Sequence, residues 1–216
     1  MSADLIIAVD GPTASGKGTI ARALARHFGL PHLDTGLLYR AVGQQVARHG
    51  GNPDDPADAL AACNFPDSLL ADPALRSEET GGLASRVSIH HAVRQALYER
   101  QRAFATRPGG AVLDGRDIGT VIAPEARAKL FITASVDARA QRRFLEMQAR
   151  GAEVTLPAIA EDLRRRDERD RNRTEAPLIP ASDALIIDTS ALDKDAAIQA
   201  AIEAVEETDR LNKASH

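Results

Sequence analysis

This 216-residue chain has no tryptophan, little aromatic content (3%) and a single cysteine, Cys63. One cysteine cannot form an internal disulfide, which favours a reducing compartment. No apolar run approaches the length of a membrane-spanning helix, and the first residues lack the basic-then-apolar order of a signal peptide. A net charge of −4 gives no support to a general nucleic-acid-binding surface. We therefore expect a cytoplasmic protein that binds neither membrane nor nucleic acid.

The rest of the composition, 44% hydrophobic and 27% charged, is typical of a globular protein. Its length suits one domain, residues 1–216, with insertions. Strand-like and helix-like segments alternate, which predicts an α/β fold with a parallel sheet. The expected strands are Leu5–Val9, His32–Leu33, Ala111–Leu113, Leu130–Thr133 and Ala184–Ile187. No long apolar helix face is left unexplained, so we expect a monomer.

Two segments fall outside this alternation. Gly50–Gly82 is rich in glycine, proline and aspartate, which predicts a peripheral, loop-rich insertion. In Gln148–Arg173, Thr155 is expected to cap the start of a helix that has Pro157 in its first turn.

Four of the expected strands end near an aspartate. These residues are Asp10, Asp34, Asp114 and Asp188. Ligands of open parallel sheets bind beyond the carboxyl ends of the strands, so this pattern predicts an active edge there. Helix capping is the alternative explanation, and it stays open for Asp34 and Asp188.

The segment Asp10–Thr19 has the pattern of a phosphate-binding loop. It follows an apolar strand and precedes a segment of helical spacing. Glycines let the backbone wrap an anion, the helix N-terminus adds partial positive charge, and Lys17 adds a full one. The hydroxyl, on Thr19, comes one place later than in the strict pattern, and it still suits Mg²⁺ or a phosphate oxygen. The loop therefore predicts a polyphosphate site, most simply for ATP, against the alternative of a ligand-free turn.

An arginine-rich segment, Arg164–Arg173, carries six arginines, three acidic residues and no lysine. On a helix, Arg166, Asp170 and Arg173 would share one face. A solvated helix with ion pairs between neighbouring turns is the simple interpretation. The preference for arginine instead favours phosphate recognition, because the planar guanidinium matches phosphate oxygens.

The turn Leu113–Thr120 follows another apolar strand. Asp114 is placed to orient the hydration shell of Mg²⁺, Arg116 to reach a phosphate, and Asp117 to accept hydrogen bonds from an amine. A plain Asp-Gly turn is the alternative.

The segment Asp34–Arg40 begins a helix. The free N–H groups of its first turn and the hydroxyl of Thr35 could hold an acceptor phosphate, with Arg40 slightly more than one turn further on. In isolation, it would be an ordinary capped helix.

Taken together, these segments resemble the bacterial cytidylate kinases of the nucleoside monophosphate kinase family. The matching stretches are Asp10–Thr19, Leu33–Arg40, Ser85–Arg94, Arg100–Phe104, Leu113–Thr120, Arg166–Arg173 and Ala176–Leu185. The resemblance implies a P-loop nucleoside monophosphate kinase fold, with a parallel sheet of five strands in the order 2-3-1-4-5 flanked by helices. It also implies a monophosphate-binding region within residues 40–100 and a lid within residues 144–166.

The resemblance implies phosphorylation of CMP and dCMP with ATP and Mg²⁺, and it assigns roles to matching positions. Catalytic roles fall on Lys17, Asp114, Arg116 and Arg143. The ATP site comprises Gly11, Pro12, Thr13, Ala14, Ser15, Gly16, Lys17, Gly18, Thr19 and Arg139, with Thr19 also a ligand of Mg²⁺. The acceptor site comprises Arg40, Arg116 and Arg173 for the phosphate, Ser85, Arg94 and Asp117 for cytosine, Arg166 and Asp170 for the sugar, and Thr35 nearby.

The chain departs from the family in the monophosphate-binding region. Cys63–Arg76 is short and has little strand character, whereas family members typically carry a longer insertion with a small β-sheet. Two alternatives remain: another small P-loop kinase with a different acceptor, and a GTPase-like switch. The guanine-reading pattern N-K-x-D that would mark the switch does not occur in the chain.

Overall fold

The computed structural model describes residues 4–214, with side chains as far as Leu211. The chain forms two compact units. The first contains the residues up to Leu33 and those from Ala105 onward, and the second is Asp34–Phe104.

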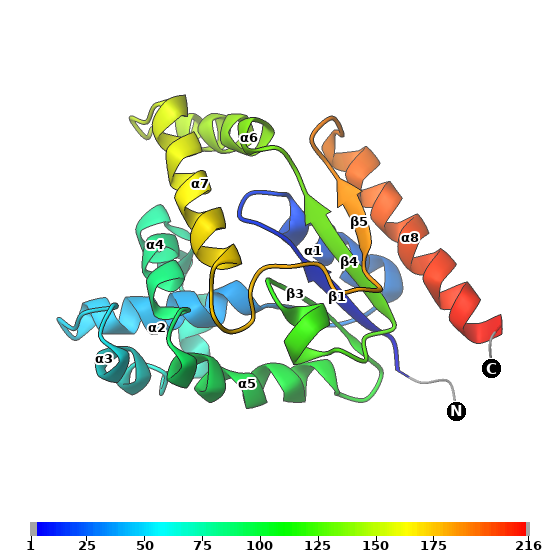
Figure 1. The fold of residues 1–216 in the computed structure, drawn as a ribbon, viewed down its shortest axis with the longest axis horizontal. Coiled ribbons are helices and arrows are strands. Elements are labelled where there is room, and N and C mark those ends of the chain that lie inside the picture. The colour runs from blue at the N-terminus through cyan, green and yellow to red at the C-terminus, as the bar shows by residue number, and fades with distance from the viewer. Residues whose placement is uncertain (1–3, 215–216) are drawn as a thin grey trace. The chain divides into compact units, whose positions relative to one another are not determined.

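A parallel sheet of five strands, in the order β2-β3-β1-β4-β5, forms the centre of the fold (Figure 1). The strands are β1(Ile6–Asp10), β2(His32–Asp34), β3(Ala111–Gly115), β4(Ala128–Thr133) and β5(Leu185–Asp188). Every residue of β1 and β3 is buried, as expected for central strands covered on both faces. The predicted fold class, strand order and strand positions are confirmed.

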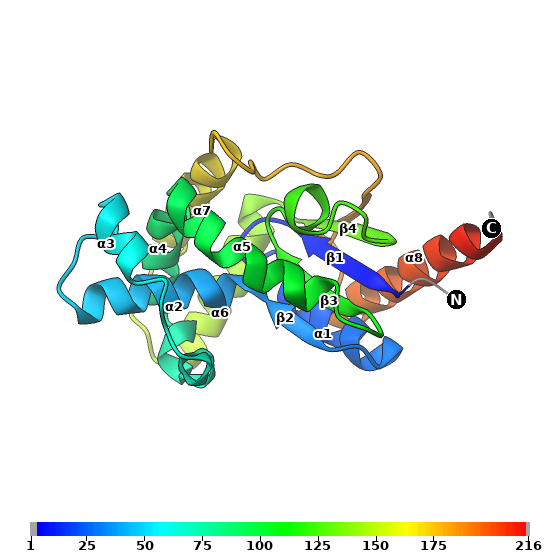
Figure 2. The same cartoon turned by 90° about the horizontal axis from the view of Figure 1, so that it is seen from below.

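Two helices, α1(Lys17–Phe28) and α8(Lys194–Ala214), pack together on the sheet (Figures 1 and 2). Ile20 and Leu24 of α1 join Ala201 and Val205 of α8 in the core above β1, β3 and β4. These side chains recur at helical spacing, so each helix buries one continuous face. The turn between β1 and α1 is thus fixed at both of its ends.

The first unit also contains a π-helical turn η3(Ile118–Ile122) and the helices α6(Val136–Ala149) and α7(Leu156–Arg171). Thr155 caps α7, accepting a hydrogen bond from the N–H of Ala158, as the sequence predicted. α6 and α7 pack through a small apolar cluster formed by Ala140, Ile159, Ala160 and Leu163. Because α7 ends at Arg171, Arg173 lies beyond the helix, and the prediction that it shares a helical face with Arg166 and Asp170 was wrong.

The second unit is helical after Asp34. It contains α2(Thr35–Arg48), α3(Pro56–Ala61), the 3₁₀ turns η1(Asp67–Ala71) and η2(Pro73–Arg76), α4(Glu78–Val87) and α5(His91–Ala105). The expected loop-rich character of Gly50–Gly82 was wrong, because capping side chains start helices there. Asp55 accepts hydrogen bonds from the N–H groups of Ala57 and Asp58, and Ser77 caps α4.

The first residue after β1, Gly11, passes against the backbone of β4. Its φ is +153°, and a Cβ placed on it would stand 2.0 Å from the carbonyl oxygen of Ile132. Backbone cannot yield as the end of a flexible side chain can, so this position excludes every side chain. Gly29, which ends α1 at φ +66°, has open space around it.

We expect Gly11→Ala to lower the free energy of unfolding by at least about 3 kcal/mol, through the clash and the strained φ together. Gly29→Ala is the matched control. It introduces only the strain of a left-handed backbone and should lower the free energy of unfolding by about 1 kcal/mol. Urea unfolding of the two variants provides the comparison. Equal losses of stability would contradict the close approach to β4.

Candidate active site

The segment Gly11–Thr19 forms a turn that closes on the start of α1. Gly16 and Ala14 adopt positive φ values of 90° and 62°, which bend the backbone into a tight loop. The first turn of α1 contains no acidic residue, and it opens with Lys17, whose Nζ lies 3.3 Å from the carbonyl oxygen of Pro12. A helix N-terminus and an ammonium group thus converge on one concave turn, which is the arrangement that binds phosphate.

Ser15 lies at the bottom of this turn. Its side chain is fully buried, and its Oγ has no hydrogen-bond partner within the part of the chain that the structure describes. Its carbonyl oxygen accepts a hydrogen bond of 3.1 Å from Thr189 Oγ1, just after β5. An orphaned buried hydroxyl is costly, so this atom fits a site that an anionic ligand completes.

Thr13, at the outer edge of the turn, is held by two arginines. Arg116 donates from Nη2 to Thr13 Oγ1 at 2.7 Å, and Arg139 donates from Nη1 to the Thr13 carbonyl oxygen at 3.1 Å. Each arginine also pairs with an aspartate of α7: Arg116 with Asp170 at 2.8 Å, and Arg139 with Asp167 at 2.5 Å. We call these five residues the Thr13 junction.

Asp170 is ionised in this junction. Burial alone would raise the pKa of its carboxyl group, but the positive charges of Arg116, Arg173 and Lys17 and the hydrogen bond from Arg116 together hold it below the ordinary value. Arg173 also donates from Nε to the carbonyl oxygen of Asp170 at 3.3 Å. Within the Thr13 junction, two arginines face two aspartates, so the charges of these four side chains balance without a ligand.

Asp10 connects the end of β1 to the turn after β3. Its carboxylate accepts hydrogen bonds from the N–H groups of Ile118 at 2.9 Å and Gly119 at 2.8 Å. These bonds hold the first residues of η3, and Asp117, directly before them, is buried. π-helical turns are rare and are frequent at functional sites. Burial, the largest effect, raises the pKa of Asp10 to about 7 despite the two backbone donors.

Asp114 lies beside the turn as well. A Cβ on Gly18 would stand 3.6 Å from Asp114 Oδ2, and the same oxygen accepts a hydrogen bond of 2.8 Å from His32 Nε2. Thr19 Oγ1 accepts one of 3.3 Å from Arg22. Residues 4–214 contain no cluster of three or more His, Cys, Asp or Glu suited to a metal ion. One hydroxyl and one nearby carboxylate fit Mg²⁺, which binds chiefly through waters and nucleotide phosphates.

The other two strand-end aspartates behave differently. Asp188 accepts hydrogen bonds from the N–H and the hydroxyl of Ser190, so it stabilises a turn. Asp34 stands at the N-cap position of α2, but its side chain makes no capping hydrogen bond.

The remaining predicted residues of the first unit lie in ion pairs on their own helices. Arg143 pairs with Glu146 at 2.9 Å on α6, and Arg166 pairs with Asp162 at 2.7 Å on α7. Their roles stay predictions.

In the second unit, Arg40 of α2 donates from Nη1 to the carbonyl oxygens of Leu75 and Ser77, both at 2.8 Å. Gly81 of α4 leaves room for it, since a Cβ there would stand 2.9 Å from Arg40 Nη2. A side chain at position 81 would therefore require the Arg40 guanidinium to shift.

Of the other predicted residues in this unit, Thr35 is buried at the start of α2 and Ser85 lies on α4. Arg94 is buried and stacks over the ring of Tyr39, with its Cζ 5.8 Å from the ring centroid. The structure thus describes each of them in place, while their roles stay predictions.

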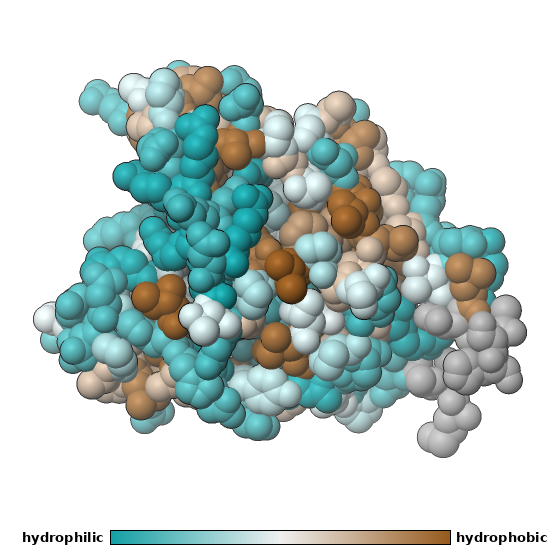
Figure 3. Space-filling model, in the orientation of Figure 1, coloured by the Kyte–Doolittle hydropathy of each residue, from teal (hydrophilic) through white to brown (hydrophobic). Residues whose placement is uncertain are grey.

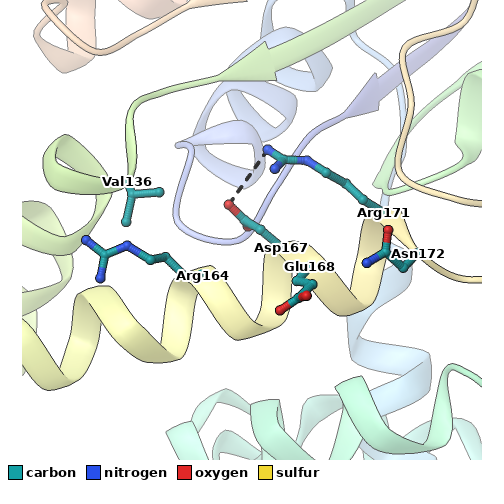
Figure 4. A pocket seen from close by; sticks show the side chains of 6 residues that line it. All are labelled: Val136, Arg164, Asp167, Glu168, Arg171 and Asn172. Carbon is teal, nitrogen blue, oxygen red and sulfur yellow. Dashed lines mark ion pairs between the residues drawn. The ribbon is translucent and has the colours of Figure 1, made fainter.

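A pocket of about 260 Å³ opens along α7. It is lined by Val136, by four residues of the helix and by its C-cap: Arg164, Asp167, Glu168, Arg171 and Asn172. Figure 4 shows Asp167 and Arg171 pointing to the same side of α7, and their charged groups are 3.9 Å apart. The exposed surface over α7 is strongly hydrophilic (Figure 3). Asp167 therefore lies between the buried Arg139 and the polar surface.

The sequence did not predict three of these partners: Asp167, His32 and Thr189. Asp167 was visible only as one of several charges in the arginine-rich segment. His32 and Thr189 contact residues far away in the chain, and no local pattern could have identified them.

A parallel sheet of this strand order, with a phosphate-binding turn after β1 and arginines around it, defines a P-loop phosphotransferase. The family described as cytidylate kinase matches residues 7–207, and the chain belongs to that family. Among residues 4–214, no helix is both long and apolar enough to cross a membrane.

Relatives named cytidylate kinase match almost the whole chain. That of Xanthobacter autotrophicus is 54% identical, covering 94% of this chain and 97% of its own. That of Cereibacter sphaeroides is 56% identical, covering 93% and 94%. Among solved structures, a gluconokinase from Sinorhizobium meliloti has a TM-score of 0.52 at 15% identity, with 98% of both chains covered. This last likeness concerns the fold alone.

We expect the pKa of Asp10 to make stability depend on pH. Its native pKa of about 7 lies above the ordinary 3.8, so the protonated carboxyl favours folding below pH 4 and this contribution is lost as the pH rises to 7. Asp10→Asn has no ionisable group at this position, so it does not lose stability through this effect as the pH rises. The melting temperature of the native protein minus that of Asp10→Asn should therefore fall from pH 4 to pH 7.5. A constant or rising difference would contradict the raised pKa.

Proposed function

We propose that this chain transfers the γ-phosphoryl group of ATP to CMP and dCMP. Membership of the cytidylate kinase family carries this proposal, and the phosphate-binding turn with its arginines supplies the chemistry. Phosphoryl transfer needs in-line positioning and neutralisation of charge more than covalent catalysis.

On the donor side, the backbone of Gly11–Thr19 and the ammonium group of Lys17 bind the phosphates of ATP. Bound Mg²⁺ would neutralise phosphate charge, held through the Thr19 hydroxyl and oriented by Asp114. Arg139 and Arg143, at the base of the proposed lid of residues 144–166, act on this side of the reaction.

On the acceptor side, the phosphate of CMP is bound by Arg40, Arg116 and Arg173, with Thr35 nearby. The second unit overlaps the region 40–100 to which we assign monophosphate binding. Arg166 and Asp170 bind the sugar. The acceptor oxygen is largely ionised at neutral pH, because the second pKa of a phosphate monoester is about 6, so no general base is needed.

Cytosine is recognised by hydrogen-bond polarity. Its N4 amine donates to the carboxylate of Asp117, while Ser85 and Arg94 donate to its N3 and O2 acceptors. Uracil has an acceptor, O4, where cytosine has the amine. O4 and the carboxylate of Asp117 would then be two acceptors facing each other, with no donor between them. CMP is thus preferred to UMP.

The proposal is tested by ADP release with ATP and Mg²⁺ in the presence of CMP, dCMP, UMP, AMP or no acceptor. We expect release that depends on CMP or dCMP, with UMP far slower. Release that is independent of every monophosphate would refute the proposal and favour a different acceptor or a switch.

Lys17→Met should lower kcat by at least about 10²-fold, because it removes a preorganised cation beside the transferring group. Lys194→Met, at the exposed start of α8, is the matched control and should leave kcat unchanged. A Lys17→Met enzyme that turns over at a near-normal rate would remove Lys17 from the mechanism.

Asp117→Ala should reduce the preference for CMP over UMP, measured as the ratio of kcat/KM for the two acceptors. The loss should fall mainly on CMP, because only cytosine donates a hydrogen bond to the carboxylate. An unchanged ratio would mean that other residues read the base.

A further inference from the structure

We propose that Asp167 is a positioning residue that fixes the ATP-binding turn through Arg139, an inference that rests on the proposed function of that turn. Asp167 touches neither nucleotide in the roles assigned above. It acts on the carbonyl oxygen of Thr13 through the guanidinium of Arg139.

The contact between Asp167 and Arg139 is bidentate. Nη1 and Nη2 of Arg139 donate to Oδ1 and Oδ2 of Asp167 at 3.0 and 2.5 Å. The two side chains are only 2% and 4% exposed. Two parallel hydrogen bonds fix the plane of the guanidinium, so Asp167 determines where the remaining N–H groups of Arg139 point.

Those N–H groups hold two backbone carbonyl groups, one after β4 and one in the ATP-binding turn. Nε donates to the carbonyl oxygen of Ala134, after β4, at 3.0 Å, and Nη1 donates to that of Thr13 at 3.1 Å. The next residue, Ala14, has a φ of +62°, which is strained for a residue with a side chain. Such strain persists only where the surroundings fix the backbone, and the Thr13 carbonyl is the fixed point directly before it.

Stability alone does not explain the pair. Burying two charges costs desolvation free energy, and an apolar pair of similar volume often serves stability equally well or better. An apolar pair cannot donate a hydrogen bond to Thr13. Positioning is therefore the property that only the arginine–aspartate pair supplies.

A second pair of side chains also connects α7 to Thr13. Asp170 lies one turn along α7 from Asp167 and holds Arg116, which donates to the hydroxyl of the same Thr13. The helix that carries Asp170, a proposed sugar contact, is thus connected to the carbonyl oxygen and the hydroxyl of Thr13 in the ATP turn. We infer that α7 and the ATP turn keep their geometry together.

The test uses Asp167→Asn, Arg139→Met, and the double variant Arg139→Met with Asp167→Leu. The readouts are the melting temperature, the dissociation constant of a fluorescent ATP analogue with Mg²⁺, hydrogen exchange of the amides of residues 11–19, and KM for ATP and CMP. Glu203→Gln, an exposed acid on α8 outside the proposed lid, is the control and should change none of them.

Asp167→Asn should weaken binding of the ATP analogue about tenfold, as expected for a lost charge-assisted hydrogen bond, with faster exchange in residues 11–19. KM for CMP should change less. The double variant should recover the native melting temperature while keeping the weakened binding and the fast exchange, which a purely structural role would not produce.

Two results would overturn the inference. One is native binding and exchange in Asp167→Asn or in a stable double variant. The other is weakened binding in Arg139→Met but not in Asp167→Asn, which would mean that Asp167 does not position Arg139. Because binding and exchange do not require phosphoryl transfer, a native protein that binds ATP without phosphorylating CMP would refute the proposed function and leave this inference standing.

Discussion

Two hydrogen bonds to Thr13, one to its carbonyl oxygen and one to its hydroxyl, connect the phosphate-binding turn to the rest of the active site. Each donor also pairs with an aspartate of α7, Arg116 with Asp170 and Arg139 with Asp167. Together with the close approach of Gly11 to β4, these contacts connect the turn to both β4 and α7. Under the proposed function, the geometry around the phosphates of ATP therefore depends on two aspartates that lie 154 and 157 positions after Thr13.

Under the proposed function, charge balance explains how a chain of net negative charge can hold a site for two polyanions. The chain carries a net charge of −4, yet arginines and Lys17 gather around the turn. Asp170 remains ionised among them and compensates part of their charge while no nucleotide is bound. Under the proposed function, nucleotide phosphates would bind where the cations are already partly compensated, which costs less than maintaining a cluster of uncompensated cations.

Much of the fold was predictable because its signals are local. The apolar strands, the glycine-rich turn before Lys17 and the Thr155 cap each follow from a few consecutive residues. The prediction that Gly50–Gly82 is loop-rich failed because it was based on the glycine and proline content of the segment. The capping residues Asp55 and Ser77 instead start the helices α3 and α4 there. The bidentate pair of Arg139 and Asp167 spans 28 positions, and no periodicity marks it.

The central claim is that one chain holds a donor and a cytidine acceptor at the same time. It is tested most directly by calorimetric binding of adenosine and cytidine joined through five phosphates. The account predicts one molecule bound per chain, displacement of both ATP and CMP, and far tighter binding than ATP alone, since the second end binds intramolecularly. Binding no tighter than ATP, with CMP undisturbed, would contradict it.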